Sequence, residues 1–113
     1  MKLFCLLLSL LCAATQAAGN AARGKELSGS CWGCHGETGI SPIPGNPNLA
    51  GQKAVYLEYA LKAYRSRERK GGLAEIMYVN AAPLSDQDIL DLVAYFSSQP
   101  GDNTNQLRVK ETP

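Results

Sequence analysis

The sequence predicts an all-α protein. Apolar residues recur at three- and four-residue intervals over residues 53–66, and a capped helix start introduces a second such pattern over residues 85–99. No alternation of apolar and polar residues of the kind found in strands competes with these patterns. Because 113 residues set an upper bound of one ordinary domain, we expect one small helical domain.

The beginning of the chain indicates export. Lys2 precedes an apolar run over residues 3–14, and small residues follow it. This is the outline of a secretory signal peptide, and the run is shorter than the roughly 20 residues that a membrane-spanning helix needs. We therefore expect a signal segment over residues 1–19, cleaved at its end or two residues earlier. The expected product is soluble and periplasmic, without a stable membrane anchor.

Three helical segments are expected after the signal. The first runs from about Ala21 to Cys34 and is rich in small residues, which allow another helix to approach closely. The second runs from about Lys53 to Ser66. The third begins at Ser85, a good N-cap, with Asp88 in the place of the capping-box acid, and ends near Ser97 to Gln99.

Loops connect these segments within a domain expected over residues 20–100. Residues 36–51 are rich in glycine, proline, asparagine and serine, so we expect a loop there, and it lacks a core pattern of its own. We also expect a loop over residues 71–80, between the second and third helices. Residues 101–113 form a polar C-terminal tail.

The charge balance excludes some partners. Removal of the signal segment takes away Lys2 alone among the charged residues, which leaves ten basic and ten acidic side chains. A formally neutral chain is not suited to nucleic acid or to an anionic membrane surface.

The stretch Cys31-Trp32-Gly33-Cys34-His35 has the spacing of the attachment motif for c-type haem. Each thiol can form one thioether bond with the porphyrin, and the adjoining imidazole can then bind the iron. A redox dithiol would need a βαβ pattern around the motif, which is not visible. A closed zinc site needs about four Cys or His ligands, and His35 is the only histidine. We therefore predict one covalently attached haem.

The second axial position of the iron has one candidate ligand. No other histidine is present, the cysteines outside the signal segment are used in attachment, and Met77 is the only methionine besides Met1. We expect Met77 to bind the iron opposite His35. A haem with histidine and methionine ligands has no open coordination site, and the soft thioether raises the potential, which suits one-electron transfer.

With these residues in place, the chain resembles the class I c-type cytochromes, of the small single-haem bacterial type. The resemblance covers nearly all of the chain after the signal. Its motifs, in order, are Gly24-Lys25, Cys31 to Gly36, Pro47 to Gln52, Tyr56-Leu57, Met77, Leu84 to Ile89 and Ala94 to Phe96.

The resemblance implies the class I cytochrome c fold, with three main helices and loops around one haem. It implies that His35 is the proximal ligand and Met77 the distal one. It also implies that the backbone carbonyl of Pro47 accepts a hydrogen bond from His35, and that Arg69 contacts a haem propionate. Glycine is common in the family where Arg67 stands, so we expect the turn after the second helix to differ here.

We therefore expect an electron carrier, not an enzyme, that passes one electron between larger redox proteins whose identity the sequence does not give. Two alternatives stay open. The first is a permanent cytochrome subunit of an oxidoreductase complex rather than a free monomer. The second is a haem enzyme or gas sensor in which the bond to Met77 is labile.

Overall fold

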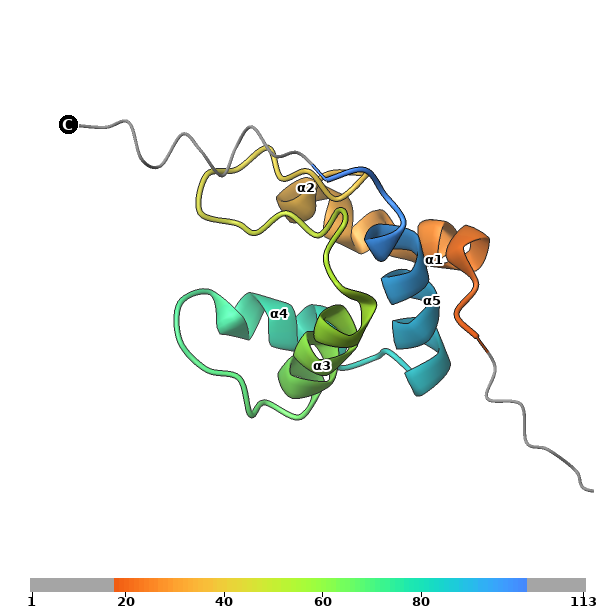
Figure 1. Ribbon diagram of the computed structural model, residues 1–113. Helices are drawn as coiled ribbons and strands as arrows, with labels where there is room; N and C mark the ends of the chain where they lie inside the picture. The colour runs from red at the N-terminus through yellow and green to blue at the C-terminus, as the bar shows by residue number, and fades with distance from the viewer. Residues whose placement is uncertain (1–17, 102–113) are drawn as a thin grey trace, which may run out of the picture.

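The computed structural model describes residues 18–101, which form helices and loops without a strand, as the sequence predicts. Figure 1 shows the arrangement. The signal segment and the polar tail expected from the sequence lie almost wholly outside the described residues. In chain order the elements are α1 (Ala21–Leu27), the 3-10 helix η1 (Ser28–Cys31), α2 (Trp32–His35), α3 (Ala54–Arg65), α4 (Ala74–Ala81) and α5 (Asp86–Ser97).

The first expected helix is divided into three parts. α1 ends at Leu27, the chain tightens into η1, and α2 then ends at His35. The sequence predicts one helix from about Ala21 to Cys34, and its small residues do not show the tighter turn between α1 and α2. Gly36 ends α2 with φ +80°, and a Cβ there would lie 1.9 Å from the carbonyl oxygen of Ile40. The chain therefore has to turn away directly after the histidine.

α1 packs against α5, and the two lie side by side in Figure 1. A Cβ at Gly24 would lie 1.9 Å from the carbonyl oxygen of Asp91 and 3.0 Å from Cβ of Tyr95. Only glycine permits so close an approach of the two backbones. Gly24 therefore has the packing role that the sequence predicts for the small residues of the first helix, whereas a Cβ at Gly29 would meet nothing within 4 Å.

A buried carboxylate joins the same two helices. Asp91 is 1% exposed. It accepts hydrogen bonds from the backbone N–H of Asn20 (2.7 Å), Nη1 of Arg23 (2.5 Å) and Nε2 of Gln87 (2.9 Å). These three donors hold the pKa of Asp91 below its usual range, the backbone bond most strongly. Sequence reasoning missed this contact because nothing in the local pattern marks an aspartate on α5 as buried.

α5 supplies most of the apolar core. Its buried apolar residues pack together with Leu57 of α3, and they are Ile89, Leu92, Val93, Tyr95 and Phe96. The helix begins with the predicted capping box. Oγ of Ser85 accepts from the backbone N–H of Asp88, and Oδ2 of Asp88 accepts from the N–H of Ser85, both at 3.0 Å. α5 therefore starts and ends close to the predicted residues.

The expectation of a loop over residues 71–80 is wrong, because residues Ala74–Ala81 form the helix α4. Ile76, Met77, Tyr78 and Val79 follow one another as large apolar or aromatic residues, so no single apolar stripe marks the segment. The segment is also short, at 8 residues, and is therefore below the length at which periodicity is informative.

The turn between α3 and α4 contains the one non-glycine residue with positive φ among the described residues. Arg67 has φ +62°, in the left-handed region that glycine occupies at least cost. The backbone here has a conformation that suits glycine, although the residue is an arginine.

Among the described residues no helix is long and apolar enough to cross a membrane.

Candidate haem site

The cysteines and the histidine of the motif lie on two consecutive short helices. Cys31 is the last residue of η1, while Cys34 and His35 are in α2. Cys34 is exposed and Cys31 is partly buried, and the two are not joined by a disulfide. Burial raises the pKa of the Cys31 thiol, the nearby Cys34 adds to this, and a hydrogen bond with Ser30 opposes it. Both sulfurs are thus available as thiols for covalent attachment.

His35 is buried, at 8% exposed, and its ring is oriented by the loop that follows. Nδ1 of His35 lies 2.8 Å from the carbonyl oxygen of Pro47. A carbonyl oxygen can only accept a hydrogen bond, so Nδ1 donates and carries the ring proton. Nε2 then has a free lone pair, which is the form of imidazole that binds iron. This is the contact that the family resemblance implies for Pro47.

Hydrogen bonds fix the loop against the motif. The carbonyl oxygen of Cys34 accepts from Oγ of Ser41 at 2.7 Å and from Nδ2 of Asn46 at 3.2 Å. The backbone N–H of Ser41 in turn donates to Oδ1 of Asn48 at 2.7 Å. The segment that carries Pro47 is therefore tied to α2 on both sides of the proline.

Further bonds close the loop on itself and on α5. The carbonyl oxygen of Gly39 accepts from the backbone N–H groups of Leu49 (2.7 Å) and Ala50 (3.1 Å). The hydroxyl of Tyr95 donates to the carbonyl oxygen of Glu37 at 2.7 Å. The expected wrapping loop is thus held by hydrogen bonds to its backbone, which explains why it lacks a core pattern.

Met77 lies in the middle of α4 and is partly buried. In Figure 1, α4 and α2 lie on the same side of α5. Large apolar side chains of α2, of the loop after it and of the start of α4 are exposed, namely Trp32, Ile43, Leu73 and Ile76. Exposed apolar side chains, two thiols, an oriented imidazole and a thioether are the groups that would hold a large apolar macrocycle with an iron at its centre.

The same residues do not fit a bare metal ion. No group of three or more His, Cys, Asp or Glu side chains that could hold an ion occurs among residues 18–101.

Arg69 lies in the turn after α3, with its guanidinium carbon 4.8 Å from the centre of the Tyr64 ring. Its contact with a propionate stays a prediction.

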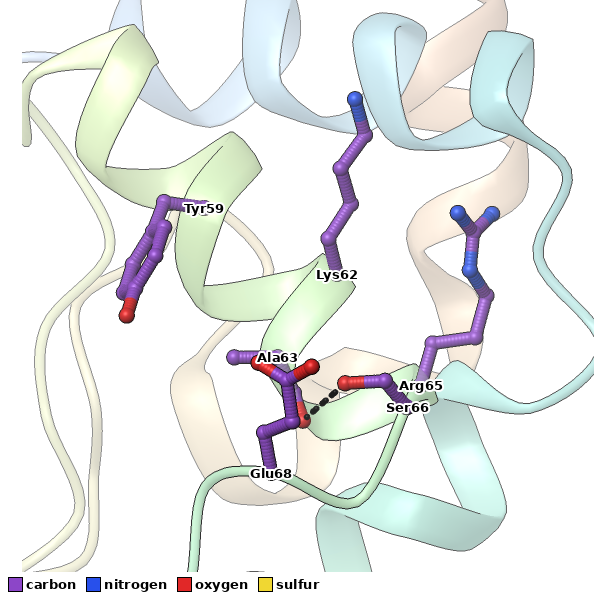
Figure 2. Close-up of a pocket in the computed structure, with 6 residues that line it drawn as sticks. All are labelled: Tyr59, Lys62, Ala63, Arg65, Ser66 and Glu68. Atoms are coloured by element: carbon purple, nitrogen blue, oxygen red, sulfur yellow. Dashed lines mark hydrogen bonds between the residues drawn. The ribbon is translucent and has the colours of Figure 1, made fainter.

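A surface cleft lies at the end of α3, and Figure 2 shows its lining, Tyr59, Lys62, Ala63, Arg65, Ser66 and Glu68. These residues include none of the predicted haem contacts.

A helical domain that presents two free thiols and an oriented imidazole within five residues belongs to the class of proteins with covalently bound haem. The family model described as Cytochrome c matches residues 21–100, and the chain is a member of the cytochrome c family. It is therefore an electron carrier with a covalently attached c-type haem, and not an enzyme.

Relatives of two lengths resemble the chain. Cytochrome c-554(548) of Halomonas halodenitrificans is 52% identical over 82 residues, which cover 73% of this chain and 99% of that protein. Cytochrome c4 of Stutzerimonas stutzeri is 41% identical over 91 residues, covering 75% of this chain and 43% of that one. The crystal structure of reduced recombinant cytochrome c4 from Pseudomonas stutzeri matches with a TM-score of 0.67 and 39% identity, over 75% of this chain and 48% of that one. The chain thus spans nearly all of the first relative and less than half of the cytochromes c4.

Proposed function

We propose that this cytochrome is exported to the periplasm and carries one electron at a time between larger redox proteins on a haem with His35 and Met77 as axial ligands. Cys31 and Cys34 attach the haem. When bound, the haem supplies an iron that accepts and releases a single electron.

The observation that carries the proposal is the hydrogen bond between His35 and Pro47. It sets the protonated nitrogen toward the carbonyl, at 2.8 Å, and leaves Nε2 as the coordinating atom. It also fixes the plane of the imidazole, so that the ring need not reorient when the iron changes oxidation state. A rigid, pre-oriented ligand suits an electron carrier, because little reorganisation accompanies each transfer.

Met77 is supported as the second ligand by its chemistry. It is the only methionine among the described residues, and His35 is the only histidine of the chain. A thioether is a soft ligand that favours ferrous iron and raises the reduction potential. With both axial positions taken by side chains, the protein offers no position for a small-molecule substrate.

Carbon monoxide binding tests this ligand set. Reduced wild-type protein should bind carbon monoxide weakly at neutral pH, because Met77 occupies the position. Met77→Ala should bind it readily and should have a lower reduction potential. Val79→Ala is a matched control, since two residues along a helix of 3.6 residues per turn lie on nearly opposite sides, and Val79 is 75% exposed. Ready binding by the wild type would instead favour a gas sensor or haem enzyme.

Docking to partners should rely on apolar contact more than on charge. The chain carries 11 basic and 10 acidic residues, so long-range steering is weak. We expect the rate of electron transfer to a partner to change little with added salt. A steep fall of that rate with ionic strength would show that a charged surface guides docking.

A second candidate is a cytochrome that works in a complex with one dehydrogenase. The thiosulfate dehydrogenase electron acceptor of Stutzerimonas stutzeri strain A1501 is 34% identical over 76 residues, although this chain covers only 35% of it. Copurification of a dehydrogenase with the chain from its host, at constant ratio on a sizing column, would favour this function. Elution as a free small protein would favour the shuttle.

A further inference from the structure

Helix α4 is held to the rest of the fold by few side chains. Only Ala74 and Ala81, at its two ends, are buried, and its main packing partner is α3. Leu73 and Ile76 are at least half exposed. Small side chains bury little apolar surface, so core packing alone does not fix the rotation of α4 about its axis. Met77 lies in the middle of this helix.

Four side chains link α4 to the end of α3 and to the turn between them. The guanidinium carbon of Arg67 lies 5.3 Å from the centre of the Tyr78 ring, and that of Arg69 lies 4.8 Å from the centre of the Tyr64 ring. The two rings are 6.3 Å apart with an interplanar angle of 58°. These distances are within the ranges of attractive cation–π and aromatic contacts. We call the four residues the tyrosine–arginine cluster.

A hydrogen bond closes this cluster. The hydroxyl of Tyr78 donates to the backbone carbonyl of Arg69. The ring of Tyr78 therefore contacts Arg67 at its face and the tilted ring of Tyr64, and its hydroxyl is held by the backbone of the turn. Because Tyr78 follows Met77 directly on α4, fixing the direction of one side chain fixes the direction of the other.

We propose that the tyrosine–arginine cluster is a positioning device that sets the rotation of α4 and so holds the sulfur of Met77 where it can bind the haem iron. The inference rests on the proposed function, in which Met77 is a ligand. It assigns a role to the cations of the turn that does not involve a propionate or a partner protein. It also explains why Arg67 is found where the backbone suits glycine, since glycine would leave the Tyr78 ring without its cation.

The test compares holoprotein variants by the strength of the methionine–iron bond. Tyr78→Leu removes the ring and the hydroxyl, and Tyr78→Phe removes the hydroxyl alone. Tyr59→Leu is the matched control, because Tyr59 is a helical tyrosine on α3, is 68% exposed and lies outside the cluster. The readouts are the weak deep-red absorbance band of methionine-ligated ferric haem, the affinity of the reduced protein for carbon monoxide, and thermal unfolding followed by circular dichroism.

We expect Tyr78→Leu to bind carbon monoxide about tenfold more tightly than Tyr59→Leu does, the factor expected when a ring in one aromatic and one cation–π contact is lost. Its deep-red band should weaken at temperatures well below global unfolding. Tyr78→Phe should show a smaller change in the same direction. A purely structural role would lower the unfolding temperature without separating the loss of the band from unfolding.

The outcomes distinguish this inference from the proposed function. A wild type without the deep-red band would overturn the ligation by Met77 and the positioning role together. The positioning role alone would be overturned by a different result. In it, the wild type shows the band, and Tyr78→Leu has the same band and the same carbon monoxide affinity as Tyr59→Leu. If Tyr78→Leu does not accumulate as folded holoprotein, Arg67→Gln decides by the same readouts, since it removes the cation over the Tyr78 ring and leaves both rings and Arg69 in place.

Discussion

The carbonyl oxygen of Pro47 lies 2.8 Å from Nδ1 of His35 and accepts the proton of the imidazole. The contact spans the loop of residues 36–51, so the orientation of the ring depends on a segment that has almost no core of its own. Hydrogen bonds from the Ser41 and Tyr95 hydroxyls and from the backbone N–H of Gly51 in turn hold the loop to α2 and α5. The local geometry of the loop therefore controls the chemistry of the histidine.

Pro47→Ala should weaken this contact without removing it. The carbonyl stays, but the freer backbone of alanine costs about 1 kcal/mol of stability through the unfolded state. A weaker hydrogen bond makes the imidazole a poorer electron donor to the iron, so the reduction potential should rise. Redox titration measures this, with Pro44→Ala, an exposed proline of the same loop, as control. A potential that falls would show that Pro47 acts in another way.

Gly24→Ala should be strongly destabilising. Its Cβ would be placed 1.9 Å from the carbonyl oxygen of Asp91, so α1 and α5 would have to separate. Overpacking of this kind costs about 1–3 kcal/mol. Denaturant unfolding of the holoprotein measures the cost. Gly29→Ala is the control, because a Cβ at Gly29 would meet nothing within 4 Å. Equal stability of the two variants would contradict the close packing of the helices.

Ser85→Ala should cost about 1 kcal/mol, because it removes the side-chain acceptor at the start of α5. The backbone N–H of Asp88 loses its 3.0 Å bond to the Ser85 hydroxyl. Only the other bond of the capping box, from the backbone N–H of residue 85 to the Asp88 carboxylate, is then left. Ser97→Ala, at the other end of the same helix, makes a suitable control. Thermal unfolding that leaves both variants equal to the wild type would show that the cap contributes nothing.

Stability should fall in acid through Asp91. Its pKa is lowered in the folded state by the N–H of Asn20, by Arg23 and by Gln87. An aspartate with a lowered folded pKa binds its proton more readily when unfolded, so its stabilising effect is complete above the unfolded value of about 3.9. The effect is lost as the pH falls through the lower folded value.

Asp91→Asn tests this pH dependence. The variant should unfold at a lower temperature than the wild type at neutral pH, and the two melting temperatures should converge below pH of about 4. The measurement is the melting temperature of both holoproteins across the acid range. A difference in melting temperature that stays constant at all pH values would contradict a role for the charge of Asp91. The stabilisation would then come from its hydrogen bonds alone.

Sequence reasoning predicted the parts of this protein that depend on local signals. The capping box of Ser85 and the apolar stripe of α5 are read from neighbouring residues, and both are confirmed. The burial of Asp91 and the helical state of residues 74–81 were missed for different reasons. Asp91 is buried by donors from α1, far away in the sequence, and α4 is too uniformly apolar to show a periodicity.

The candidate site shows the same division. The attachment motif is a local pattern and was recognised directly, and the contact of Pro47 was implied by the family resemblance. The tyrosine–arginine cluster combines residues from α3, α4 and the turn between them, and the sequence showed only a run of cations there. The sequence alone does not reveal the cluster, because its tyrosines and arginines meet across the turn between α3 and α4. The backbone conformation of that turn is not predictable from the local pattern.

The deep-red absorbance of the oxidised holoprotein tests the central proposal most directly. If His35 and Met77 are the axial ligands, the wild type should show the weak deep-red band of methionine-ligated ferric haem, and Val79→Ala should keep it. Met77→Ala should lose it completely while retaining the covalent haem. A band that persists in Met77→Ala, or a wild type that never shows it, would contradict the assignment of Met77 and with it the closed, six-coordinate electron carrier.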